Sequence, residues 1–198
     1  AEADVFFFFL DSNGNFVLAK QIGGSSWEEG YGISTDDSGN VYSTGGFSGP
    51  TDFDPGPGTY NLMSASNYDI YILKLDSQGN FVWAEQLGVA NINEGVKTSV
   101  SVDNSNKLLL TGYFSGTADF DPGPETLNMT ALVSDDIFIL KLNPNGSLMW
   151  AKQIGGTSSE RANSICVDNF GNVYTTGIFA GITDFDPGNN IYNLSSFG

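Results

Sequence analysis

The sequence contains no histidine, a single cysteine and few basic residues, and each shortage excludes a class of function. Without histidine, the chain lacks the usual general base that activates a serine or cysteine nucleophile. Cys166 stands alone and cannot form an intramolecular disulfide. Seven Lys and Arg against 23 Asp and Glu give a formal net charge of −16, which argues against binding to nucleic acid or to an anionic membrane surface.

Long apolar runs are also missing, so we expect no membrane insertion. Residues 5–10 are apolar, but this run is shorter than the core of a signal peptide and no basic residue precedes it. We therefore expect any export signal to lie outside this chain. The hydrophobic content of 40% is enough for a packed core, and 25 glycines suit a protein with many turns.

A long repeat dominates what is present. The sequence Asp-Phe-Asp-Pro-Gly occurs at residues 52–56, 119–123 and 184–188, and the residues around it recur with it. A fixed period of about 66 residues is typical of repeat architectures. We therefore expect a single repeat array over residues 1–198, with repeat units 4–68, 69–135 and 136–198.

Each unit contains four short segments that are typical of β-strands. The first is a dense apolar and aromatic run, as in a strand that is buried on both faces. Turns with Asp or Asn followed by Gly join the first strand to the second and the third to the fourth, as in tight hairpins. A long loop with the Asp-Phe-Asp-Pro-Gly motif follows. The predicted strands are 4–10, 69–75 and 136–142; then 16–22, 81–87 and 148–154; then those centred on Ile33, Val100 and Ile165; and finally 41–47, 108–114 and 173–179.

This pattern predicts an all-β fold made of β-propeller blades. Helical periodicity is absent, which excludes a parallel α/β array. Four-stranded antiparallel units of this size are the blades of propellers, and blades that stack face to face cover both sides of each sheet. A flat β-solenoid is the competing architecture, but its repeats are usually shorter and lack two hairpins per unit.

The repeats are offset from the predicted blades. The chain starts at the third strand of a conventional blade and stops after the loop that should precede it. Propellers typically have four to eight blades, so three units would leave an open ring. Further blades in a longer chain, or association between chains, would complete the ring, and we expect the longer chain.

A recognisable set of residues occurs at Asp136–Leu142, Gly146, Trp150–Gly156 and Asp168–Gly177. In these residues the units resemble the SBBP-type β-propeller repeats of large secreted or surface bacterial proteins, and the resemblance covers essentially all of the chain. The longer variant with Asp-Phe-Asp-Pro-Gly is similar to repeats common in exported Bacteroidota proteins. The resemblance implies a propeller and an extracellular or cell-surface location, without a catalytic activity. The first unit departs from it, because Phe9 replaces the lysine of Lys74 and Lys141, and Leu18 replaces tryptophan. These changes suggest a terminal or interface-facing blade.

The aspartates of the repeated motif are the candidate metal ligands. Calcium takes six to eight oxygen ligands, and two carboxylates with nearby carbonyls could supply part of such a site. In the favoured alternative the motif is a structural turn, in which Pro sets φ, Asp accepts backbone N–H bonds and Phe fills a gap between blades. The candidate ligands are Asp52, Asp54, Asp119, Asp121, Asp184 and Asp186.

Other residues have weaker functional interpretations. Trp27 and Tyr31 do not recur in the other units and stand in a predicted loop, so they are candidates for surface recognition. Cys166 is expected to be a small core residue of the third strand rather than a nucleophile. A glutamate recurs between the second and third strands, and we expect it to accept hydrogen bonds from loop amides. Its three copies are Glu28, Glu94 and Glu160.

The expected function is a non-enzymatic module for binding, adhesion or spacing in an exported protein, with a protein or glycan at the cell surface as partner. Two alternatives remain. One is a calcium-dependent glycan-binding module. The other is part of a propeller enzyme that acts on extracellular polysaccharide, with its catalytic residues outside this chain.

Overall fold

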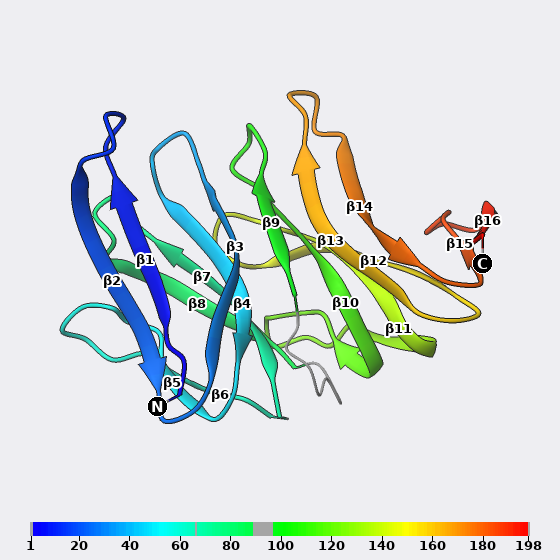
Figure 1. Ribbon diagram of the computed structural model, residues 1–198, viewed down its shortest axis with the longest axis horizontal. Coiled ribbons are helices and arrows are strands. Elements are labelled where there is room, and N and C mark those ends of the chain that lie inside the picture. The colour runs from blue at the N-terminus through cyan, green and yellow to red at the C-terminus, as the bar shows by residue number, and fades with distance from the viewer. Residues whose placement is uncertain (1, 66, 89–96, 198) are drawn as a thin grey trace.

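The computed structural model describes residues 2–65, 67–88 and 97–197, and all regular elements in these ranges are β-strands. The all-β prediction is therefore confirmed. Within the same ranges, no helix is long and apolar enough to cross a membrane. Figure 1 shows β1 and β2 at one end of the molecule and β13 and β14 toward the other end, where the C-terminus lies.

The strands form antiparallel sheets in which one order recurs. The first complete sheet has the order β3-β4-β7-β8, and the second complete sheet contains β9-β10-β11-β12 in the equivalent order. The N-terminal pair β1–β2 and the C-terminal pair β13–β14 each form half of this pattern. The main strands are β1 (Val5–Leu10), β2 (Phe16–Gly24), β3 (Glu28–Thr35), β4 (Val41–Phe47), β7 (Asp69–Leu75), β8 (Phe81–Leu87), β9 (Ser99–Val102), β10 (Leu108–Asp119), β11 (Asn128–Leu142), β12 (Leu148–Gly156), β13 (Glu160–Val167) and β14 (Val173–Phe179).

The predicted long loop contains a short hairpin that the sequence analysis did not anticipate. In the first unit this hairpin is β5 (Pro50–Asp52) with β6 (Asn61–Met63), and in the third it is β15 (Ile182–Asp184) with β16 (Asn193–Ser195). In the second unit, the hairpin is the continuation of β10 and β11 beyond a register shift. β5 pairs with the end of β2, and β15 pairs with the end of β12. Each of these two hairpins is therefore hydrogen-bonded to the outer strand of the preceding sheet.

The hairpin turns between main strands follow the predicted chemistry. Gly14, Gly39, Gly79, Gly146 and Gly171 all have positive φ, which L side chains rarely adopt. In the second unit, Asn106 stands at the corresponding place with φ 58°, and asparagine tolerates this conformation better than most residues.

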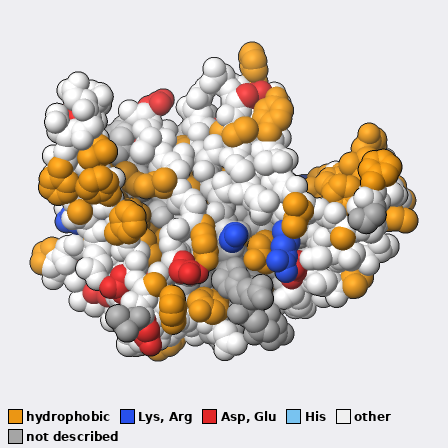
Figure 2. Space-filling model, in the orientation of Figure 1, with side chains coloured by type: hydrophobic (Ala, Val, Ile, Leu, Met, Phe, Trp, Pro, Cys, Tyr) orange, Lys and Arg blue, Asp and Glu red, His pale blue; other side chains and the backbone are white. Residues whose placement is uncertain are grey.

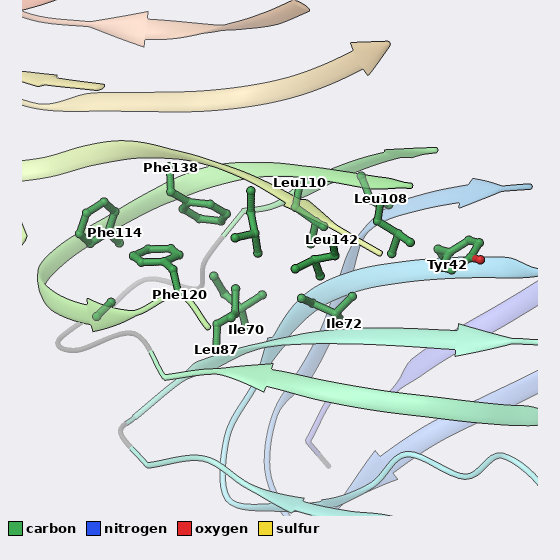
Figure 3. Close-up of a cluster of buried hydrophobic side chains, with 13 residues drawn as sticks. Tyr42, Ile70, Ile72, Leu87, Leu108, Leu110, Phe114, Phe120, Phe138 and Leu142 are labelled. Atoms are coloured by element: carbon green, nitrogen blue, oxygen red, sulfur yellow. The ribbon is translucent and has the colours of Figure 1, made fainter. Parts of the chain in front are cut away.

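The two complete sheets pack face to face. Ile70 and Ile72 from β7 lie in one cluster with Phe138, Leu140 and Leu142 from β11, as Figure 3 shows for its labelled members. Other members of this cluster are Tyr42, Leu87, Val100, Leu108, Leu110, Phe114, Ala118 and Phe120. The cluster buries one face of each sheet, which is the main stabilising contribution expected for apolar sheets.

A second cluster joins the N-terminal pair to the first complete sheet. Val5, Phe7 and Ile22 from the pair pack against Tyr71 and Leu73 of β7. Since Ile70 and Ile72 point into the other cluster, β7 is buried on both faces, as predicted for the first strand of a unit. The prediction is wrong for β1, where Phe6, Phe8 and Leu10 are exposed because no sheet covers that face in the structure.

Cys166 also departs from the prediction. It was expected in the core, but it is exposed on β13, whereas its neighbour Ile165 points inward and is buried. Alternation along a strand places adjacent side chains on opposite faces, so a one-residue change in position decides whether a side chain is covered.

Candidate functional site

The three Asp-Phe-Asp-Pro-Gly loops have the same internal hydrogen bonds. In the first loop, Asp52 Oδ1 accepts the backbone N–H groups of Asp54 at 3.0 Å and Tyr60 at 2.8 Å. Asp54 Oδ1 accepts the N–H of Gly56 at 2.7 Å. The equivalent bonds join Asp119 to Asp121 and Leu127, Asp121 to Gly123, Asp184 to Asp186 and Tyr192, and Asp186 to Gly188. One carboxylate oxygen of each motif aspartate is therefore hydrogen-bonded to backbone N–H groups of its own loop, which agrees with the structural-turn interpretation.

The phenylalanine between the two aspartates anchors each loop. Phe120 is fully buried, with its ring centroid 4.9 Å from that of Phe114 and 5.1 Å from that of Phe138. Phe53 is buried in the same way between Phe47 and Tyr71, at 5.2 Å from each. In the third unit, Phe185 keeps the contact with Phe179 at 5.2 Å. The tilted and edge-on ring geometries are those that favour aromatic pairs.

The structure contains only part of the ligand set that the metal-ligand hypothesis requires. Asp4, Gln21, Asp52 and Asp54 line one open hollow beside Gly23 and Gly24. Within the described ranges, however, no three acidic, histidine or cysteine side chains converge as a metal site would require. The arrangement offers oxygen atoms to a polar or cationic ligand at the surface, while its best-defined contacts are with the loop's own backbone.

An aspartate–glutamine pair, which sequence reasoning missed, joins the first two strands of every unit, and in the second and third units the glutamine also bonds the hairpin that precedes the pair. Gln153 Nε2 donates to Asp136 Oδ2 at 2.6 Å and to the carbonyl oxygen of Thr130 at 2.8 Å. The equivalent bonds join Gln86 to Asp69 at 3.3 Å and to the Met63 carbonyl at 3.1 Å, and Gln21 to Asp4 at 2.5 Å. The sequence does contain a pattern that could have indicated this pair, because in all three units Asp begins the first strand and Gln lies near the end of the second.

Burial gives Asp136 unusual electrostatics. Its side chain is fully buried, and its Oδ1 atom has no hydrogen-bond partner among the described residues. Burial raises the pKa of Asp136, because desolvation disfavours the charged form, although bonds from Gln153 and the Leu132 N–H act in the opposite direction. Gly155 makes room for this carboxylate, since a Cβ there would lie 2.1 Å from Asp136 Oδ2.

The recurring glutamate accepts hydrogen bonds in the two copies that the structure describes, from a threonine hydroxyl in both and also from a backbone amide in the Glu28 copy. Glu28 Oε1 accepts the hydroxyl of Thr51 at 2.8 Å, and its Oε2 accepts the Gly24 N–H at 3.1 Å. Glu160 Oε1 accepts the hydroxyl of Thr183 at 2.8 Å. Burial raises the pKa of Glu28 and of Glu160. Glu94 lies outside the described residues.

The two candidate recognition residues are at the surface but in different surroundings. The Trp27 side chain is exposed, and the backbone N–H of Trp27 donates to the hydroxyl oxygen of Ser48 at 3.1 Å. The prediction of a loop is wrong for Tyr31, which lies on β3 because the strand begins at Glu28. Tyr31 lines a larger groove together with Phe6 and Phe8 of β1, whereas Trp27 is not part of that lining. Burial and a hydrogen bond to Glu29 raise the pKa of the Tyr31 hydroxyl. The two residues do not form a common aromatic platform.

The recurrent aromatic residues serve the core. Phe47 and Phe114 are fully buried, and Trp83 packs against the cluster between the complete sheets. The Trp83 indole N–H donates to the Pro144 carbonyl at 3.1 Å, which joins the outer strand of the first complete sheet to a turn of the second.

Comparison with known proteins supports the repeat assignment over a short stretch. Residues 150–177 match the family model described as SBBP, beta-propeller repeat. The chain is also 29% identical over 136 residues to an uncharacterized WD repeat-containing protein of Acanthamoeba polyphaga mimivirus, in an alignment that covers 62% of this chain and 9% of that protein. The chain thus spans about a tenth of the length of this relative. The matched segment contains β13 and most of β12 and β14, so this part of the chain is similar to an SBBP β-propeller repeat. The 62% of the chain that aligns with the WD repeat-containing protein is distantly related to it.

Proposed function

We propose that this chain is a segment of a β-propeller that serves as a non-enzymatic binding or spacing module of an exported or cell-surface protein. The observation that carries the proposal is the equivalence of the three motif loops. In each, the first aspartate accepts two backbone N–H groups and the second accepts one. Acidic residues with the same backbone role in every repeat are parts of a scaffold, since a catalytic pair is needed at only one place.

The propeller arrangement itself is supported by two further observations. Both complete sheets have the same strand order, and the β7 and β11 strands at their centres contribute to apolar clusters that join consecutive sheets. The family match over residues 150–177 is to a propeller repeat. Repeats that bury their faces against copies of themselves are what a propeller requires.

A hydrolysis assay tests the non-enzymatic part of the proposal. The purified chain is incubated with a panel of bacterial and plant polysaccharides, and the release of reducing ends is measured. We expect release no greater than that from buffer. Release that disappears in the double variant Asp54→Asn with Asp121→Asn, but persists in Asp37→Asn on an exposed turn, would refute the proposal and favour a propeller enzyme.

Calcium-dependent glycan binding is the second candidate, and the hollow beside Asp4, Asp52 and Asp54 favours it. The test is thermal unfolding in EGTA and in excess calcium. The scaffold proposal predicts the same unfolding midpoint in both, because a ligand that binds only the folded state would raise it. A midpoint raised by calcium and lost in Asp52→Asn would support the second candidate.

Surface recognition is tested separately. Retention of the chain on immobilised glycans is compared for the wild type, Trp27→Ala and Tyr31→Ala. A binding module predicts that retention falls in at least one variant, and a spacer predicts no retention by the wild type. The exported location is tested by fractionating cells that produce the natural protein, with recovery in the surface or secreted fraction as the expected result.

A further inference from the structure

Four side chains that do not recur between the units meet where the second complete sheet contacts the strand pair after it. Tyr113 lies on β10, Asp135 on β11 and Arg161 at the start of β13, and Ser159 immediately precedes β13. Arg161 is the single arginine of the sequence. We call these four residues the Arg161 cluster; none of them lies on β1 or β14.

The first and third units show that the fold does not require this cluster. Each member stands beside a residue that recurs, so its counterparts in the other units are identified by the sequence. The counterparts differ in charge, size and chemistry from the cluster residues. Residues that serve the scaffold recur, as in the motif loops, whereas a single binding site needs its residues at one place only. The counterparts are Glu29 for Arg161, Tyr68 for Asp135, Gly46 and Ile178 for Tyr113, and Trp27 for Ser159.

One oxygen of Asp135 takes every hydrogen bond that this carboxylate accepts within the described residues. Arg161 Nε donates to Asp135 Oδ2 at 2.7 Å, and Arg161 Nη2 lies 2.6 Å from the same oxygen. The Ser159 hydroxyl donates to it at 3.0 Å. A carboxylate accepts at both oxygens, and the Asp135 side chain is 14% exposed. Oδ1 is therefore an acceptor that a ligand can reach.

The guanidinium of Arg161 is held beside this acceptor in a fixed orientation. Its carbon lies 4.8 Å from the ring centroid of Tyr113, a cation–π contact, while its Nε edge is bonded to Asp135. The Arg161 side chain is 41% exposed, whereas Tyr113 beneath it is buried. A guanidinium presents five N–H donors in a rigid plane. Residues from three strands thus place a donor group and an acceptor oxygen next to each other at the surface.

Further aromatic groups lie close to the cluster. Burial and the Glu29 hydrogen bond raise the pKa of Tyr31 most, and the neighbouring Tyr113 and Tyr68 add to this effect. Tyr31 is on β3, and β3, β9 and β13 lie side by side (Figure 1). Figure 2 shows basic side chains near the middle of the drawn face, next to hydrophobic and acidic ones. Donors, acceptors and aromatic groups therefore share one region of the molecule.

We infer that the Arg161 cluster binds a neutral saccharide through two adjacent hydroxyl groups. One hydroxyl donates to Asp135 Oδ1, and its neighbour accepts from the guanidinium of Arg161. A hydroxyl is both a donor and an acceptor, so an adjacent pair on one sugar matches an acceptor and a donor that lie side by side. This inference rests on the binding module proposed above and assigns that module a ligand class and a site.

The charges favour a neutral sugar over a charged ligand. Arg161 and Asp135 carry opposite charges and offset each other within the cluster. The net charge of −16 repels an approaching anion. A cation would have to compete with Arg161 for Asp135, whereas a hydroxyl pair bonds to both residues without separating them.

Nuclear magnetic resonance of the ¹⁵N-labelled chain tests the inference at the site itself. Because Arg161 is the single arginine, its Nε–H gives one signal that needs no further assignment. The three tryptophans give three indole N–H signals that report on other places. The chain is titrated with neutral oligomers of glucose, of galactose and of mannose. We expect at least one of them to shift the Arg161 signal to saturation, while the indole signal of Trp83, whose N–H is bonded to the Pro144 carbonyl, stays in place.

Variants then test the two polar partners. Arg161→Lys keeps the charge and loses the planar fork, and Asp135→Asn removes the charged acceptor. Each should weaken the binding of the oligomer that shifts the Arg161 signal by roughly tenfold or more, as expected for a lost bond to a charged group. Lys152→Gln and Asp37→Asn remove exposed charges elsewhere and are the matched controls, which should bind as the wild type does. Thermal unfolding of every variant shows whether it is folded; if Asp135→Asn is not, the wild-type titration and Arg161→Lys still decide.

The outcomes separate this inference from the proposed function. An Arg161 signal that no neutral oligomer moves would overturn the inference, as would unchanged affinity in both cluster variants. A sugar that moves the Trp27 indole signal but not the Arg161 signal would overturn this site and leave the binding module standing. Tighter binding of oligogalacturonate than of any neutral oligomer would overturn the ligand class. A chain in which no sugar moves any signal would refute the inference together with the glycan-binding role, and would leave the spacer.

Discussion

Replacing Phe120 by alanine should show how strongly a motif loop is tied to the core. Phe120 is fully buried and contacts the rings of Phe114 and Phe138. A buried aromatic side chain hides roughly 150–250 Å², which corresponds to about 4–6 kcal/mol at ~25 cal/mol per Å². Part of that is retained by alanine and by relaxation of the cavity, so we expect a loss of about 3–5 kcal/mol in the free energy of unfolding.

Urea unfolding followed by tryptophan fluorescence measures this loss. Phe53→Ala should cost a similar amount, because Phe53 is equally buried and has two ring contacts at 5.2 Å. Phe170→Ala, at an exposed turn, is the control and should change stability by less than about 0.5 kcal/mol. A cost for Phe120→Ala as small as that of the control would show that the loop is not anchored as described.

Three further changes test the buried and strained groups. Burial alone would raise the pKa of Asp103, but hydrogen bonds from Lys141, Lys107 and Ser105 outweigh it, so the pKa is lowered. The ionised Asp103 therefore stabilises the fold fully above the ordinary pKa of 3.8, and this stabilisation is lost as the pH falls below that value. Asp103→Asn should be less stable than the wild type at pH 7, and the difference between their urea midpoints should narrow in acid. Burial raises the pKa of Glu160, so ionisation of Glu160 destabilises the fold as the pH rises above the ordinary pKa of 4.5. Glu160→Gln keeps an acceptor for the Thr183 hydroxyl and should be more stable than the wild type at pH 7 but not below pH 4.5. A lower stability of this variant at pH 7 would contradict this reasoning. Asn106 has φ 58°, so Asn106→Ala should lower the free energy of unfolding by about 1–2 kcal/mol, whereas Asn106→Gly should not, as thermal melts of both variants would show.

Much of the fold could be predicted because the strands repeat with their turns. The bounds of β4, β7, β8 and β14 are those predicted, and glycine or asparagine has positive φ at each hairpin turn. The β5–β6 hairpin was missed because its strands are only three residues long and β5 pairs with the preceding sheet. A local sequence pattern therefore does not predict it.

The site could be predicted only where local chemistry decides it. The bracing of the Asp52 loop involves residues close in the sequence, and Asx-type bonds follow from Asp before Pro-Gly. The bond from Gln153 to Asp136 joins two strands, and only the sheet register brings these residues together. The exposure of β1 depends on what lies beyond the sheet edge, which an apolar sequence pattern does not specify.

The central claim is that consecutive sheets pack face to face through apolar clusters. The most direct test is nuclear Overhauser contacts between methyl and ring protons across the two complete sheets. The account predicts contacts that join Ile70 and Ile72 of β7 to Phe138, Leu140 and Leu142 of β11. Contacts confined to each sheet, with none between these two sets of side chains, would contradict it.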